Sequence, residues 1–116
     1  MSYLGYLFIG QYECFDTAFD LVVRFGDLTE ALEKIEKVKG TKREQEAREW
    51  IAFLLDDIES LFAEVERTCR VSLAQFKPEL EDLYWRFAHR DYVGMDIVLD
   101  NLAWRMSAFF VRQDIL

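Results

Sequence analysis

Residues 92–112 read YVGMDIVLDNLAWRMSAFFVR, and this stretch decides what kind of fold the chain can adopt. Its apolar residues fit an α-helix with one stripe along each of two opposite sides. A helix in a small bundle normally has one apolar face and one polar face that is exposed to solvent. The second stripe therefore predicts either a fully surrounded helix or a surface for a partner. One stripe contains Met95, Leu99, Leu102, Met106 and Phe109, and the other contains Val93, Ile97, Trp104, Ala108 and Val111.

The same periodicity predicts two more long helices before this one. Residues 42–70 carry Ile51, Leu55 and Ile58 at alternating steps of four and three, which is typical of a helix facing a core. Residues 78–89 begin with Pro78, and proline is tolerated in the first turn of a helix. Asp91 then stands where the N-cap of the last helix is expected.

The N-terminal third predicts two helices separated by a break. Residues 4–25 form the first, with Phe15, Ala18 and Val22 among the residues expected on its inner face. Gly26 and Asp27 are expected to end it. Asp27 with Glu30, and Thr41 with Glu44, have the spacing of capping boxes that open a short helix at 28–38 and the long helix at 42–70. Gly40 is expected to separate these two helices.

Composition supports an all-α fold. The 116 residues contain only 5 Gly and 1 Pro, too few turn residues for a sandwich or barrel. Short connections between successive helices favour antiparallel packing. We therefore predict one domain, residues 1–116, built as an up-and-down bundle of four main helices plus one short helix.

Charge and cysteine content restrict the setting and the partners. The net charge of −8 disfavours nucleic acid and anionic membranes, because the long-range field repels phosphate. The apolar N-terminal stretch is too short to span a bilayer and is expected to belong to the fold. Cys14 and Cys69 are expected to act as small buried apolar residues in a reducing cytoplasm, with a disulfide as the open alternative.

Candidate chemistry is limited to carboxylates. Glu46-x-x-Glu49 and Glu79-x-x-Asp82 partly match the ExxE and ExxD pairs of metal-dependent all-α nucleotide pyrophosphohydrolases. Position 45 is Gln where that family has a further Glu, and the first pair projects away from the apolar stripe, whereas bundle metal ligands point inward. The leading prediction therefore has no catalytic residue, no metal ligand and no cofactor, and the metal-dependent enzyme remains an alternative.

Aromatic residues predicted to point outward indicate a function more strongly than the carboxylates do. Trp85 and Phe53 are predicted on the polar sides of their helices, and Trp104 is at the centre of the second stripe. Aromatic anchors dominate the energetics of protein interfaces. We therefore predict a non-enzymatic interaction module, such as an adaptor, small chaperone or regulatory subunit, that forms a homodimer or binds a protein partner through the second stripe. A further alternative is an acidic inhibitor that occupies a basic protein.

The segment Asp91-Tyr-Val-Gly-Met-Asp-Ile-Val-Leu-Asp-Asn-Leu102 resembles the C-terminal helix of short, uncharacterised helical-bundle proteins of Gram-positive bacteria. Asp91, Tyr92, Val93, Asp96, Leu99 and Leu102 fit the pattern of that helix. The Leu-Glu-Tyr-Glu-Leu run usual in that family is replaced here by Leu99-Asp-Asn-Leu-Ala103. The resemblance implies a helical bundle of bacterial origin and no known activity. The helix layout is also similar to that of small secretion and flagellar chaperones.

Overall fold

The computed structural model describes the backbone from residue 3 and the side chains from residue 12 to the C-terminus. Within this part of the chain there are four α-helices, one short 3₁₀ turn and no strand. The elements are α1 (Tyr3–Val38), α2 (Glu44–Cys69), η1 (Ala74–Phe76), α3 (Lys77–Ala88) and α4 (Tyr92–Arg112). The predicted all-α class is confirmed.

Helix α1 is continuous through Gly26, so the predicted break and the separate helix at 28–38 are wrong. Asp27 does not cap a new helix; its carboxylate accepts a hydrogen bond from Arg24 of the same helix. A glycine inside a helix costs only about 1 kcal/mol relative to alanine. The buried stripe crosses the glycine with Phe25 on one side and Leu28 on the other, and burying these side chains outweighs that cost.

The turn between α1 and α2 is located where it was predicted. Gly40 has a φ of +81°, a backbone conformation that favours glycine. The predicted capping box at Thr41 and Glu44 is only partly formed. Thr41 Oγ1 accepts from the Arg43 amide, and Glu44 reaches back to the Gly40 amide at 2.8 Å, but the helix begins at Glu44 and Arg43 is its N-cap.

The other predicted signals agree with the structure. Pro78 is in the first turn of α3. The Asp91 side chain caps α4 by accepting the Gly94 amide at 2.9 Å. Both helix starts therefore follow from local backbone chemistry that is readable in the sequence.

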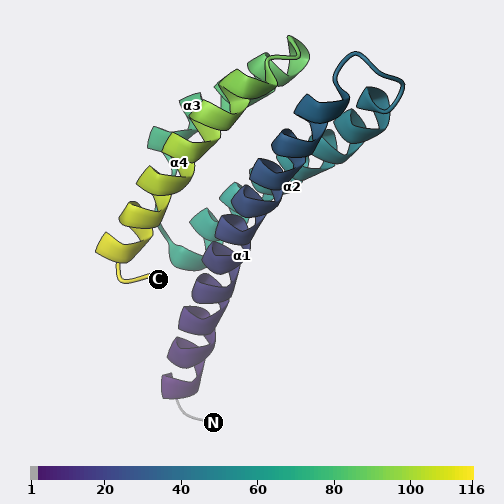
Figure 1. Cartoon of the computed structure of the whole chain (residues 1–116). Helices are drawn as coiled ribbons and strands as arrows, with labels where there is room; N and C mark the ends of the chain where they lie inside the picture. Colours follow the sequence, from purple (N-terminus) through teal and green to yellow (C-terminus); the bar gives the residue numbers. More distant parts are fainter. Residues whose placement is uncertain (1–2) are drawn as a thin grey trace.

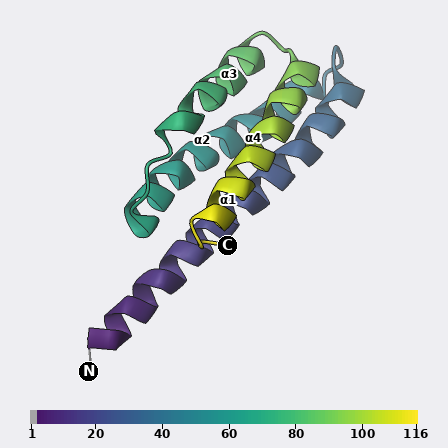
Figure 2. The same ribbon diagram turned by 90° about the vertical axis from the view of Figure 1, so that its left-hand side faces the viewer.

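The helices form two antiparallel hairpins, α1 with α2 and α3 with α4, and α4 also lies along α1 (Figures 1 and 2). Side chains of α3 reach α2 as well, as in the hydrogen bonds from Tyr84 to Asp56 and Glu59. The connectivity is up-down-up-down. The core is apolar and draws on all four helices, with fully buried members that include Leu21, Leu28, Ile51, Ile58, Leu83, Met95, Leu99, Leu102 and Met106.

Helix α1 extends beyond the other helices at its N-terminal end (Figure 1). Cys14 of α1 lies opposite Cys69, the last residue of α2, with a Cα–Cα distance of 4.8 Å. The α1 residues before Cys14 therefore have no α2 segment beside them. At 1.5 Å per residue, this overhang is roughly 16 Å long.

Candidate interaction surface

Both predicted stripes of α4 are present. Met95, Leu99, Leu102 and Met106 are fully buried, and Phe109 is 9% exposed. On the other side, four of the five predicted residues are exposed to solvent and Ala108 is half-buried. Helix α4 is therefore not fully surrounded. The exposed fractions are 58% for Val93, 67% for Ile97, 79% for Trp104 and 60% for Val111.

Helix α1 adds aromatic residues that the sequence analysis did not assign to a surface. Phe15 was predicted in the core but is 46% exposed, and its ring stacks on Phe19 at a centroid distance of 6.1 Å. Tyr12, Phe19 and Val23 are also exposed. The exposure of Tyr12 and Phe19 could have been predicted from the sequence, because both residues fall outside the core stripe of α1 when the helix is drawn with 3.6 residues per turn.

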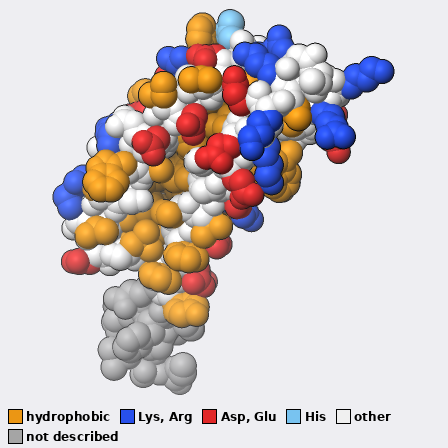
Figure 3. All heavy atoms as spheres, viewed as in Figure 1, with side chains coloured by type: hydrophobic (Ala, Val, Ile, Leu, Met, Phe, Trp, Pro, Cys, Tyr) orange, Lys and Arg blue, Asp and Glu red, His pale blue; other side chains and the backbone are white. Residues whose placement is uncertain are grey.

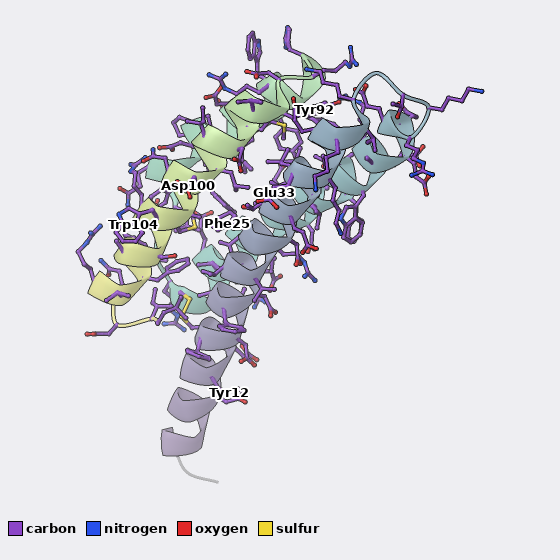
Figure 4. All side chains as sticks on the ribbon, viewed as in Figure 1. Tyr12, Phe25, Glu33, Tyr92, Asp100 and Trp104 are labelled. Carbon is purple, nitrogen blue, oxygen red and sulfur yellow. A yellow bond between two sulfur atoms is a disulfide. The ribbon has the colours of Figure 1, made fainter. Side chains whose placement is uncertain are left out.

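The side chains around Trp104 gather at one end of the molecule, whereas Val93 and Ile97 lie in the first half of α4, with the exposed Asp100 and Asn101 between them and Trp104. Figure 3 shows hydrophobic side chains over the C-terminal half of α4 and the adjoining part of α1, and Figure 4 shows Tyr12 and Trp104 at that end. We call this surface the apolar face. It comprises Tyr12, Phe15, Phe19 and Val23 of α1 and Val93, Ile97, Trp104 and Val111 of α4.

A hollow of about 260 Å³ lies beside Trp104. We call it the arginine hollow, and it is lined by Gln75, Phe76, Trp104, Arg105, Ala108 and Arg112. Arg105 is held in place by an ion pair with Glu79, and its guanidinium lies 5.4 Å from the centre of the Phe76 ring. The lining contains two arginines and no acid, in a chain whose net charge is −8.

The other two predicted contact residues are exposed but lie elsewhere. Trp85 is 57% exposed, and its ring stacks on that of His89, the C-cap residue of α3, at a centroid distance of 4.0 Å. Phe53 is 57% exposed and stacks on Trp50 at 5.5 Å. Because α1 and α3 each contact both other helices, α2 and α4 are diagonal in the bundle. Phe53 therefore belongs to a helix that contributes no residue to the apolar face.

Glu44 is the one charged residue that is buried in the described part of the chain. Its spacing from Thr41 predicted only a role in a capping box. Its carboxylate accepts two hydrogen bonds from Arg90 and one from Tyr92, each 2.6 Å long, besides the Gly40 amide. Arg48 donates to the Tyr92 hydroxyl at 2.9 Å. We call this group the Glu44 clamp. It joins the α1–α2 turn, α2, the α3–α4 turn and α4 at one end of the bundle.

The Glu44 clamp is a structural group. The hydrogen bonds from Arg90 lower the pKa of Glu44 well below its usual range, with smaller contributions from the Gly40 amide and Tyr92. Burial raises the pKa of Tyr92. Glu44 is thus a carboxylate whose oxygens are already occupied, and neither group is suited to exchange protons near neutral pH.

The structure does not bring the four candidate metal ligands together. Glu46 and Glu49 are near the start of α2, at the end of the bundle where α3 finishes. Glu79 and Asp82 are in the first half of α3 and are paired with Arg105 and Arg86. Among the side chains of residues 12–116, no group of three or more His, Cys, Asp or Glu is placed to hold a metal ion.

Cys14 and Cys69 form a disulfide, so the expectation of two free thiols is wrong. The pairing joins α1, at the point where its overhang begins, to the end of α2. It follows from the antiparallel register of the two helices, which sequence spacing alone did not determine.

No protein-family model, curated protein sequence or solved structure matches this chain. In the described part of the chain, no helix is both long enough and apolar enough to cross a membrane. The assignment of function therefore depends on the surface itself.

Proposed function

We propose that this protein is a helical interaction module that self-associates through the apolar face, with the outer stripe of α4 at its centre. The observation that carries the proposal is Trp104, a large apolar side chain that is 79% exposed. Three more apolar residues of α4 extend the same surface along the helix. Tryptophan is among the residues most enriched at the energetic centres of protein interfaces.

The size of the apolar face fits a dimer. With about 200 Å² for an aromatic and about 150 Å² for an aliphatic side chain, its exposed fractions give on the order of 830 Å² of side-chain surface. A stable interface buries about 800 Å² per partner. A second copy of this face would therefore cover a surface of ordinary interface size.

Light scattering coupled to size-exclusion chromatography tests the proposal. The wild type should elute with twice the 13.8 kDa chain mass and approach the monomer mass on dilution. Trp104→Glu should give a folded monomer, with an unchanged far-ultraviolet circular dichroism spectrum. Trp85→Glu is the matched control, because Trp85 is also an exposed tryptophan but lies on α3. Loss of the dimer in both variants, or in neither, would contradict the proposal.

The alternative of an acidic inhibitor makes a different prediction. Three acidic residues of α2 are already partnered, since Asp57 pairs with Arg24, Glu64 pairs with Arg67 and Asp56 accepts from Tyr84. This leaves a smaller acidic surface than the sequence suggested. Capture of a basic protein that weakens with salt would favour the inhibitor.

The cellular setting is also a proposal. The cytoplasm was predicted because Cys14 and Cys69 were expected to be buried apolar residues without a disulfide. The Cys14–Cys69 disulfide instead favours an oxidising compartment, because cytosolic thiol systems keep most cysteines reduced. Trapping free thiols in freshly lysed cells decides between them. Alkylation of both cysteines in the folded protein would support the cytoplasm, and protection of both would support an oxidising compartment.

A further inference from the structure

We infer that Trp104 of each copy inserts into the arginine hollow of the other copy. This inference rests on the proposed self-association and specifies how the two copies meet. The apolar face supplies the ring, and the arginine hollow borders that face at Trp104. Trp104 is its most exposed large apolar residue, and the hollow of about 260 Å³ lies directly beside it.

The chemistry of the hollow matches an aromatic ring. Arg105 and Arg112 supply guanidinium groups, which are attracted to the electron-rich face of an indole. The Arg105 guanidinium is already held by Glu79, so little side-chain freedom is lost when a ring packs against it. Phe76, Ala108 and the hollow's own Trp104 supply apolar walls. No acidic side chain lines the hollow.

The position of the hollow explains why a second copy is the fitting occupant. Trp104 and Ala108 are four residues apart, so the projecting ring and the hollow are about 6 Å apart along α4. A two-fold axis between them places each Trp104 in the partner's hollow and runs the two α4 helices antiparallel. The same surface is then used twice and the assembly closes at two copies.

Variants that fill the hollow but leave the ring in place test this arrangement. Ala108→Phe keeps Trp104 and fills the hollow beside it, whereas Trp104→Ala removes the ring and, with it, one wall of the hollow. Each variant should weaken dimerisation, by at least ~30-fold in Kd for Trp104→Ala. Sedimentation of each variant over a range of concentrations measures the change.

Controls separate the possible failures. Gln75→Trp fills the hollow from the exposed η1 side, so the test does not depend on α4 tolerating the larger side chain of Ala108→Phe. A wild type that is monomeric at every concentration would overturn the proposed self-association and this inference with it. If Trp104→Ala is monomeric while both hollow-filling variants dimerise like the wild type, self-association stands and the hollow is not used.

Discussion

The Cys14–Cys69 disulfide should supply a large part of the stability of the bundle. It closes a loop across a sequence separation of 55 residues. The chain-entropy relation gives about 4 kcal/mol for a loop of this length, because the cross-link restricts the unfolded chain. Total stabilities of small domains are about 5–15 kcal/mol. We therefore expect a Cys14→Ala, Cys69→Ala double variant to fold but to be markedly less stable than the oxidised wild type.

Urea unfolding followed by circular dichroism measures this difference. With a slope of about 2 kcal/mol per molar urea, the midpoint should fall by about 2 M in the double variant. Reductant should lower the wild-type midpoint by a similar amount and leave the double variant unchanged, which controls for effects of the substitutions themselves. A decrease in unfolding free energy below ~1 kcal/mol, or two titratable thiols in the oxidised protein, would refute the reasoning.

Other parts of the fold give three further predictions. Gly26→Ala should raise the free energy of unfolding by about 0.5–1 kcal/mol, because a Cβ at this position meets no atom within 4 Å. Gly94→Ala should lower the free energy of unfolding by about 1–2 kcal/mol, because its Cβ would collide with the carboxylate of Asp91, which caps α4. Thermal unfolding of both variants checks these opposite signs. The pKa of Glu44 in the folded protein is held below its ordinary value of 4.5, so the ionised Glu44 stabilises the fold fully above about pH 4.5 and loses this contribution as the pH falls. The Tm of the wild type should therefore drop more steeply between about pH 5 and pH 3 than the Tm of Glu44→Gln. Equal slopes in the two proteins would contradict this linkage. Raising NaCl from about 50 mM to about 500 mM should lower the Kd of the dimer, because each copy carries a net charge of −8 and salt screens the repulsion between the copies. A Kd that rises with salt, measured by sedimentation, would instead indicate an interface held by ion pairs.

The sequence predicted the helical elements well where local chemistry decides them. Asp91 and Pro78 begin helices as their capping and first-turn preferences imply, and Gly40 ends one. Gly26 was misread because tertiary burial on both sides of it outweighs its poor helix propensity. Local propensity therefore failed at the one position where a continuous core stripe opposed it.

The candidate site was only partly predictable. The outer stripe of α4 could be found from periodicity alone, because one helix carries it. The contribution of Phe15 and Phe19 depends on where α4 lies against α1, which periodicity does not specify. The Glu44 clamp and the arginine hollow each draw on several elements, so they depend on how helices far apart in sequence pack together.

The position of the disulfide also determines how the molecule would carry a mechanical load. When the two ends of the chain are pulled apart, tension passes from the α1 overhang through Cys14 directly to Cys69. The residues between them lie outside the path of the force, although they include most of α1 and nearly all of α2. Full extension would be shorter by about 190 Å than in the reduced chain, at roughly 3.4 Å for each of the 55 residues. The α1–α2 hairpin could then stay folded while the segment after Cys69 is drawn out.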